Sequence, residues 1–418
     1  MRDLSLLIML LTLAWMAWKQ PWVGLLGLVF VGIMSPQSYA SGFIQGFPAY
    51  FGLLLIVSLA SAWQYRRLRT WPRLFWDWRL AVFALLCVWF AATTYFAINP
   101  LPAREKLLEV YKLLPPLVLV LLLIDTRDKL RWLLLTVALS IAAVVLKGGY
   151  WAVITSFQDR VYGPPGSQFA GNNEFAVATT MVIPLLVLWY REIGSNRQRW
   201  FVAVLIFLAF ASALSSWSRG GLLSLSAVAL LLIWHSRRKW LAIPLLAAGL
   251  GLIFLGLPEA WFARMQTLGA PDMEASAVGR LTIWRLGWNY ALAHPWFGGG
   301  FESWIFFTPP DTEFRAWHSA YVQMAEEHGL VGLGLWGLLL GGTLLSLNWR
   351  LARNRRAHFG WGQEYAAALS TSLVAYLVGC AFLSIAYWEL LYLLLTAAIV
   401  LQHLERFDPA PNGLEQKQ

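Results

Sequence analysis

The chain has 418 residues, of which 59% are hydrophobic and only 13% are charged, against about 45–50% apolar residues in ordinary soluble domains. Apolar runs of about 15–22 residues recur along its length, and such runs cross lipid as helices because a helix satisfies its own backbone. This composition excludes a soluble domain and predicts an all-α polytopic membrane protein. The formal net charge of +10 requires no nucleic-acid partner, because membrane proteins hold Lys and Arg in their cytoplasmic loops.

In chain order, the apolar runs predict about 12 transmembrane helices. They fall near residues 4–34, 43–63, 79–98, 107–124, 132–154, 175–190, 200–217, 220–235, 240–257, 330–348, 364–384 and 388–403.

Clusters of Lys and Arg between these runs predict their orientation. The clusters are Arg66, Arg67, Arg69, Arg73 and Arg79; Arg127, Lys129 and Arg131; Arg191, Arg197 and Arg199; Arg237, Arg238 and Lys239; and Arg350, Arg353, Arg355 and Arg356. Placing them all in the cytoplasm lets every intervening run cross once. With a cytoplasmic N-terminus, residues 4–34 then cross once. The alternative is about 13 spans with the N-terminus outside.

This topology divides the chain into four parts. They are residues 1–257 with the first nine spans, a long outer loop at 258–329, the last three spans at 330–403 and a cytoplasmic tail at 404–418. The outer loop is too polar to lie in lipid and too rich in Trp and Phe for a tether. Because long loops in compact proteins are usually functional, we expect it to carry catalytic residues.

Inside this loop, residues 276–294 are predicted to form an amphipathic helix lying on or near the bundle. Arg280 and Arg285 flank its apolar face on opposite sides, so they are not expected to serve one site equally. That face carries Leu281, Trp284, Trp288 and Leu292. The sequence PWFGGGFESW follows, and its glycine triplet indicates either a plain turn or a close approach to a ligand.

The segment HSAYVQMAEEHG at 318–329 is predicted to be a short helix that enters the next span. His318 opens it, and Tyr321 lies on its face. The positive end of a helix disfavours imidazolium, so His318 is expected to be neutral and able to take a proton. The alternative is an ordinary polar histidine.

Lys147 lies toward the outer end of an apolar run. Its side chain either snorkels to the membrane surface or lines a polar cavity with an anionic occupant, and both readings stay open. Arg160, Asn172 and Asn173 follow on the same side.

The heptapeptide SSWSRGG at 215–221 places Arg219 in a very short hinge between two apolar runs, on the outer side. Arginine binds phosphate through a planar fork and keeps its charge. With Lys147, Arg280 and either Arg264 or Arg285, it would form an outer cationic site. Because cations on this side run against the positive-inside trend, they point to an anion such as a lipid-linked pyrophosphate. We expect no metal or other cofactor, since Asp272, Glu274 and Glu302 are scattered.

Four motifs in order resemble the O-antigen ligase and polymerase superfamily. They are Ser218-Arg219-Gly220-Gly221 after an apolar run, a Gly-Arg-Leu-x-x-Trp helix, Pro-Trp-Phe-Gly-Gly-Gly-Phe, and His318-Ser-x-Tyr followed by Glu-His-Gly-Leu-Val-Gly-Leu. The stretch Val161-Tyr-Gly-Pro-Pro-Gly with Asn172-Asn173-Glu174 resembles the branch that includes ligases found beside exosortase systems. The likeness covers roughly residues 145–345.

The resemblance implies a membrane glycosyltransferase of the GT-C type. Such ligases transfer a glycan from undecaprenyl pyrophosphate to lipid A–core oligosaccharide on the periplasmic face of the bacterial inner membrane, without metal or nucleotide. By the same resemblance His318 is essential, and Arg219 and Arg280 bind pyrophosphate. The likeness extends less directly to Lys147, Arg160 and Arg264.

Elementary chemistry agrees with this implication. Arginines placed at the leaving pyrophosphate stabilise its growing charge, and neutral His318 suits a general base. A single displacement predicts inversion at the anomeric carbon.

Other functions remain as alternatives. A polymerase of glycan repeats or a protein O-oligosaccharyltransferase would use the same donor site. A lipid-linked glycan flippase or transporter would carry charges near mid-span and an internal repeat, neither of which the sequence displays.

Overall fold

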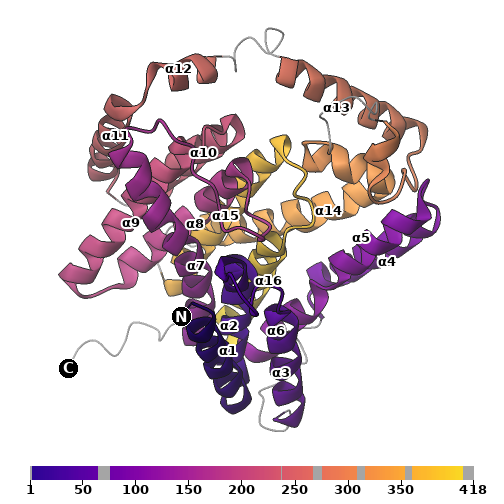
Figure 1. The fold of residues 1–418 in the computed structure, drawn as a ribbon, viewed down its shortest axis with the longest axis horizontal. Coiled ribbons are helices and arrows are strands. Elements are labelled where there is room, and N and C mark those ends of the chain that lie inside the picture. Colours follow the sequence, from indigo (N-terminus) through magenta and orange to yellow (C-terminus); the bar gives the residue numbers. More distant parts are fainter. Residues whose placement is uncertain are drawn as a thin grey trace.

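The computed structural model describes residues 2–64, 76–236, 238–266, 275–307, 316–353 and 360–407, and over these residues the chain is helical without strands (Figure 1). The α-helices are α1 (Arg2–Lys19), α2 (Pro21–Met34), α3 (Ala49–Trp63), α4 (Trp78–Tyr95), α5 (Pro100–Tyr111), α6 (Leu114–Leu123), α7 (Arg127–Ile154), α8 (Asn172–Glu192), α9 (Asn196–Ser215), α10 (Arg219–His235), α11 (Lys239–Gly256), α12 (Glu259–Gln266), α13 (Ala275–Ala293), α14 (Ala320–Arg353), α15 (Trp361–Gly379) and α16 (Glu389–Phe407). Among the described residues, 3₁₀ turns lie at η1 (Pro36–Tyr39), η6 (Ser303–Phe306) and η7 (Cys380–Phe382). The all-α expectation is confirmed.

Seven of the described helices are long and apolar enough to cross a membrane, namely α4, α7, α8, α9, α11, α14 and α15. Helices α2, α3 and α10 are apolar but shorter. Each coincides with one of the predicted apolar segments or with part of one. The chain is therefore a multi-pass helical protein of the membrane type, and the total of about 12 spans stays a prediction.

The N-terminal segment differs from its prediction. Residues 4–34 form two helices, α1 and α2, that turn back on each other at Gln20 and pack antiparallel. Gly24 faces Ala17, and Gly27 faces Leu13 one turn further along. A hairpin does not cross once, so this segment differs from the single crossing predicted for it, and the side on which the N-terminus lies stays a prediction.

The predicted span at 107–124 is also broken. Helix α5 ends at Tyr111, and α6 starts at Leu114 with Pro115 and Pro116 in its first turn. Proline is accepted there, but it cannot continue a helix from the preceding turn, because its ring clashes with the backbone and it lacks an N–H. Helix α5 instead folds back on α4, and the Tyr111 hydroxyl donates to the Cys87 carbonyl at 2.7 Å.

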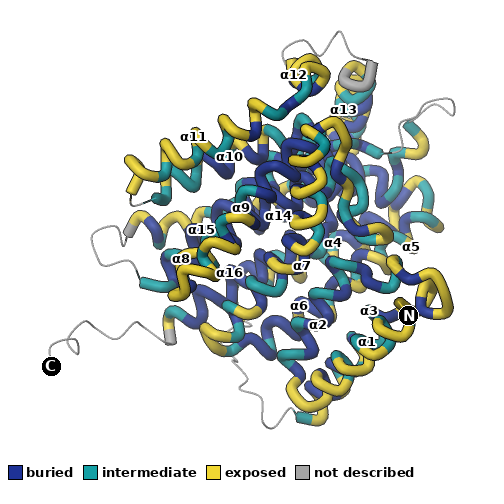
Figure 2. Tube along the Cα trace, turned by 60° about the vertical axis from the view of Figure 1, so that its left-hand side comes forward, coloured by how far each residue is buried: buried dark blue, intermediate teal, exposed yellow. Residues whose placement is uncertain are grey.

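Helices α8, α15 and α16 lie in the interior, whereas α1 and α11 have long exposed sides (Figure 2). Small residues let the inner helices approach closely. A Cβ added to Gly221 of α10 would lie 2.6 Å from the Ala176 Cβ of α8, so only glycine fits there.

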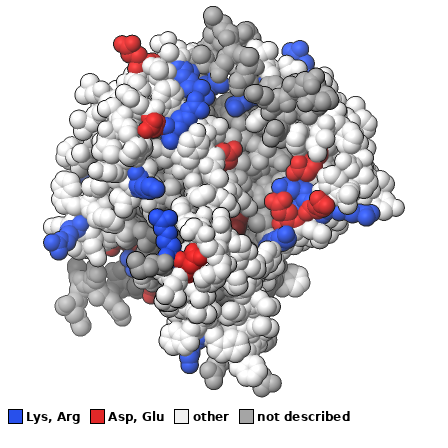
Figure 3. Space-filling view, viewed as in Figure 1, with Lys and Arg blue, Asp and Glu red and all other residues white. Residues whose placement is uncertain are grey.

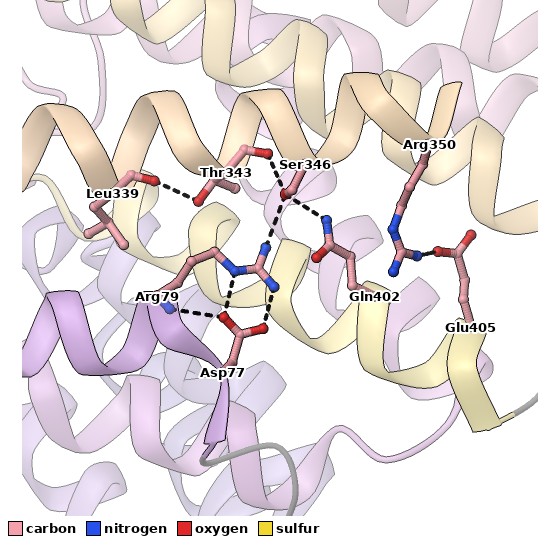
Figure 4. A network of polar contacts seen from close by, with 8 residues as sticks. All are labelled: Asp77, Arg79, Leu339, Thr343, Ser346, Arg350, Gln402 and Glu405. Atoms are coloured by element: carbon pink, nitrogen blue, oxygen red, sulfur yellow. Dashed lines mark hydrogen bonds and ion pairs between the residues drawn. The ribbon is translucent and has the colours of Figure 1, made fainter. Parts of the chain in front are cut away.

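The basic clusters that the structure describes gather at one end of the bundle. Arg131 Nε donates to Glu192 Oε2 at 2.8 Å, which joins the start of α7 to the end of α8. The start of α4 meets the ends of α14 and α16 in the same way through Asp77, Arg79, Ser346, Gln402 and the Arg350–Glu405 pair (Figure 4). This agrees with the predicted sides, while the cytoplasmic assignment stays a prediction. Arg66, Arg67, Arg69, Arg73, Arg237, Arg355 and Arg356 lie outside the described residues.

Arg79 is only 1% exposed, and its guanidinium bonds both carboxylate oxygens of Asp77, at 2.8 and 2.5 Å. We expect Asp77→Asn to lower the midpoint of thermal unfolding in detergent, because a buried cation without its partner costs about 3–5 kcal/mol. Asp128→Asn, at the exposed start of α7, is the matched control and should leave the midpoint nearly unchanged. Equal midpoints for the two variants would contradict a stabilising role for the pair.

Candidate active site

The hinge that joins α9 to α10 has a defined geometry. Ser218 caps α10, and its Oγ accepts a hydrogen bond from the Gly221 N–H at 3.0 Å. Arg219 is therefore the first residue of α10, at the end of the helix where free N–H groups and the helix dipole favour an anion. Because Gly221 lets α10 approach α8, this helix end is held firmly in the bundle.

Arg219 shares one small pocket with two further arginines from separate elements, Arg264 of α12 and Arg280 of α13. Asn173, at the start of α8, lines the same pocket. Arg264 Nε also donates to the Trp217 carbonyl in the hinge at 3.1 Å. We call this group the arginine pocket. Its remaining lining comes from Ser218, Gly220, Phe382 and Leu383.

Two predicted residues support the hinge from the neighbouring loop. Asn172 Nδ2 donates to the Ser216 carbonyl at 2.8 Å, which ties the start of α8 to the hinge. The Arg160 guanidinium lies over the Trp217 ring, 5.9 Å from its centroid. Both residues thus lie beside the arginine pocket, although neither is among the described residues that line it.

Three other predicted residues lie elsewhere. Lys147 and Arg285 are exposed on α7 and α13, away from the lining of the pocket. The Tyr321 hydroxyl donates to the Leu377 carbonyl at 2.9 Å, and its ring packs on Trp336, so Tyr321 joins α14 to α15. For these three, a role toward a substrate stays a prediction.

His318 lies between the outer loop and the span that follows. Its backbone is left-handed (φ 52°), a conformation that costs a non-glycine residue energy. Its N–H donates to the Ser384 Oγ at 2.8 Å, which anchors the strained residue. The short helix expected after it is present as the first part of α14, from Ala320 to the break at Gly329.

Burial lowers the pKa of the His318 imidazole, and the positive charge of Arg280 lowers it further, to about 4. The ring is therefore neutral at pH 7, as the sequence predicts. Its proximity to Arg280 also relates His318 to the arginine pocket.

We expect His318 to titrate near pH 4 in the isolated protein, followed by NMR of labelled histidine and assigned by comparison with His318→Asn. Arg280→Gln should raise the midpoint, because it removes a cation that disfavours imidazolium. The rise should stop short of the usual value near 6.5, since the ring stays buried. A native midpoint near 6.5 would contradict the environment described here.

The apolar face predicted for 276–294 is right only at Trp284, which is half-buried and donates to the Trp317 carbonyl at 2.8 Å. The other three predicted positions, Leu281, Trp288 and Leu292, are exposed. The buried positions of α13 are Ile283, Gly287 and Ala291, and Gly287 lies directly against Trp317 and Val322. A small residue at this point lets α13 pack closely on its neighbours.

The glycine triplet contacts protein backbone. The Gly299 and Gly300 N–H groups donate to the carbonyls of Glu326 and Glu327, at 2.7 and 2.9 Å. These bonds satisfy the end of the short helix before the break at Gly329. Gly298 and Gly300 have positive φ, a conformation that glycine adopts without strain.

Sequence reasoning missed a larger cavity of about 320 Å³ beside His318. It is bordered by Trp317, the residue before His318, and by Ser384, which accepts the His318 N–H bond. Its described lining includes four glutamates and one lysine, so we call it the glutamate cavity. They are Glu109, Glu174, Glu302, Glu327 and Lys106. Glu174 and Glu302 stand in motifs that the sequence singles out, but no spacing connects them with the other two.

The fold and the site define a multi-pass helical membrane protein in which a histidine lies near three clustered arginines. Residues 203–337 match the family model described as O-antigen ligase, and residues 1–195 match a family of unknown function. No curated protein matches the chain. The matched segment holds Arg219, Arg264, Arg280 and His318, and it is similar to the O-antigen ligase family over residues 203–337.

Proposed function

We propose that the protein is an O-antigen ligase that transfers a glycan from undecaprenyl pyrophosphate to lipid A–core oligosaccharide, at the periplasmic face of the bacterial inner membrane. The observation that carries the proposal is the convergence of Arg219, Arg264 and Arg280 on one pocket, from three separate helices of the segment that matches the ligase family. We also propose that the protein is a glycosyltransferase of the GT-C type.

In the proposed mechanism the arginine pocket binds the pyrophosphate of the donor. Guanidinium groups hold phosphate oxygens through paired, charge-assisted hydrogen bonds. The charge on the pyrophosphate grows as its bond to the anomeric carbon breaks, so fixed cations stabilise the transition state more than the bound donor. The pocket of about 30 Å³ has room for only about two waters. The arginine side chains therefore move apart when the donor binds.

His318 is the proposed general base. It takes the proton from the acceptor hydroxyl as the oxygen attacks the anomeric carbon, and the pyrophosphate leaves with the electron pair of the broken bond. Before the donor binds, burial and then the charge of Arg280 hold the pKa of His318 low. A pyrophosphate on Arg280 offsets that charge and raises the proton affinity of the ring, so the base is strengthened when both substrates are present. One displacement inverts the anomeric configuration.

The test is transfer by the purified protein. Incubation with an undecaprenyl-pyrophosphate glycan and lipid A–core should yield capped core without added metal or nucleotide. Growth of the glycan on its own lipid, with no capped core, would identify a polymerase instead. Transfer to a protein hydroxyl would identify an O-oligosaccharyltransferase, and movement of the donor across vesicles without transfer would identify a flippase.

A further inference from the structure

The glutamate cavity and the arginine pocket are neighbours that differ in charge. Two chain segments pass from one to the other at consecutive residues. At the start of α8, Asn173 lines the arginine pocket and Glu174 lines the cavity; after α15, Leu383 lines the pocket and Ser384 lines the cavity. His318 donates its N–H to Ser384, so it lies at the boundary. In Figure 3, basic side chains gather toward the upper left of the face, and a mixed group of acidic and basic side chains lies at the right.

The geometry of a single displacement assigns roles to the two sides. The nucleophile and the leaving group lie on opposite faces of the anomeric carbon. If the pyrophosphate occupies the arginine pocket, with His318 at the boundary, the attacking hydroxyl comes from the side of the glutamate cavity. Carboxylates also repel the donor phosphates, and therefore keep the donor from binding in this cavity.

The lining of the cavity suits a sugar. Its volume of about 320 Å³ is at the lower end of the roughly 300–1,000 Å³ range of small-molecule pockets. The Trp304 and Trp388 rings lie in its wall, and aromatic rings pack against the apolar faces of other rings. Carboxylate oxygens accept hydrogen bonds from hydroxyls and ammonium groups.

Gln323 brings an amide group to the wall of the cavity. Its side chain is only 7% exposed and lines the cavity. The Oε1 atom accepts a bond from the Ala386 N–H at 3.4 Å, which holds the amide in place. An amide nitrogen is a hydrogen-bond donor, so Gln323 can bind a hydroxyl oxygen of a sugar in the cavity.

We propose that the glutamate cavity is the acceptor subsite, and that it takes an accepting sugar that is neutral or carries an amino group and rejects one that carries phosphate. This inference rests on the proposed function and narrows it: the sugar of the core that receives the glycan bears no phosphate. Glu174 and Glu302 set this preference through charge, because Lys106 pairs mainly with Glu109 at 3.0 Å and Glu327 is buried against the Tyr387 hydroxyl. Gln323 and the tryptophan rings set it through contact.

The test uses three methyl glucosides that differ in charge: the 2-amino-2-deoxy compound, the neutral parent and the 6-phosphate. Their binding to the detergent-solubilised protein is measured by saturation-transfer NMR, without donor. The amino compound and the parent should bind, and the 6-phosphate should bind at least tenfold more weakly, on the order expected for a like charge a few ångströms away. Equal binding of all three would overturn the inference.

Substitutions in the cavity test whether its glutamates cause the weaker binding of the 6-phosphate. Glu174→Gln together with Glu302→Gln keeps the shape of the lining and should reduce the discrimination against the 6-phosphate by about tenfold. Glu259→Gln removes an exposed carboxylate of α12 outside the cavity, and should leave the discrimination unchanged. Gln323→Leu should weaken binding of the neutral glucoside several-fold. Unaltered discrimination in the double variant, or unaltered binding in Gln323→Leu, would place the sugar elsewhere.

Different results would contradict the proposed ligase function and the proposed acceptor subsite. Binding of the lipid pyrophosphate, measured on the same double variant, should equal that of the native protein, since these glutamates lie outside the arginine pocket. If substitution of the arginines leaves the donor affinity unchanged, the proposed function is overturned. If the three glucosides bind equally, only this inference is overturned.

Discussion

His318→Asn is expected to abolish detectable glycan transfer while leaving the affinity for the lipid pyrophosphate within a few-fold of the native value. Loss of a general base costs about 10²–10⁴-fold in rate. Asparagine is chosen because it tolerates the left-handed backbone observed at this position, so the N–H bond to Ser384 is retained. The measurement is single-turnover transfer with saturating donor and acceptor.

His294→Ala is the matched control for this prediction. His294 is exposed at the end of the same outer segment and stacks on Tyr290, away from the arginine pocket, so its loss should not slow transfer. His318→Asn with transfer within tenfold of the native rate would remove the proposed base. A native-like thermal midpoint for the variant shows that the loss is chemical and does not come from unfolding.

Arg219→Gln is expected to weaken binding of the lipid pyrophosphate by about 10- to 100-fold, because a hydrogen bond to a charged group contributes about 1.5–3 kcal/mol. The rate with saturating donor should fall as well, since the leaving charge loses part of its stabilisation. Arg219→Lys should recover part of the affinity but not all of it, because lysine keeps the charge and lacks the planar fork. Affinity is measured with a fluorescent lipid pyrophosphate.

Arg104→Gln controls for the removal of a positive charge. Arg104 is exposed on α5 and is not among the described residues that line the arginine pocket, so this variant should bind the donor like the native protein. An Arg219→Gln variant with native donor affinity would refute the phosphate-binding role of the hinge. Equal losses in both variants would indicate attraction by overall charge, which salt screens.

The helices themselves follow from local sequence. Apolar runs must be helical in lipid because no other local structure satisfies the backbone there, and α4, α7, α8, α9, α11 and α15 each coincide with a predicted segment. The predicted single spans at 4–34 and 107–124 were wrong because a turn or a helix break divides each of them. The reversal at Gln20 and the helix break at Lys112 interrupt apolar sequence, and a hydropathy profile shows each of these segments as one continuous run.

In the site, too, the sequence predicted some features and missed others. Arg219, Arg264 and Arg280 were predicted as outer-side cations, and the structure brings them to one pocket. Lys147 and Arg285 satisfy the same criterion but lie outside it. Charge statistics report the side of the membrane on which a residue lies, and they carry no information about its position within the membrane plane.

The face of α13 illustrates why periodicity failed. The predicted stripe contains the largest apolar residues, because burial in water-soluble proteins favours them. On α13 the buried positions are Ile283, Gly287 and Ala291, and Gly287 meets Trp317 and Val322 directly. The close approach at Gly287 decides which face of the helix packs, and a pattern of large apolar residues does not reveal it.

By itself, the sequence determined that this protein is a multi-pass helical membrane protein and that its motifs resemble the O-antigen ligase superfamily, whose family model matches residues 203–337. The outer-side position of its arginines and of His318 stays a prediction. These properties depend on composition, on the local helix and on the order of short motifs. Only the tertiary structure decided that three arginines share one pocket and that four distant glutamates line a cavity beside His318. Such groupings depend on which helices pack together, and that choice is made by side-chain shape between segments far apart in the chain.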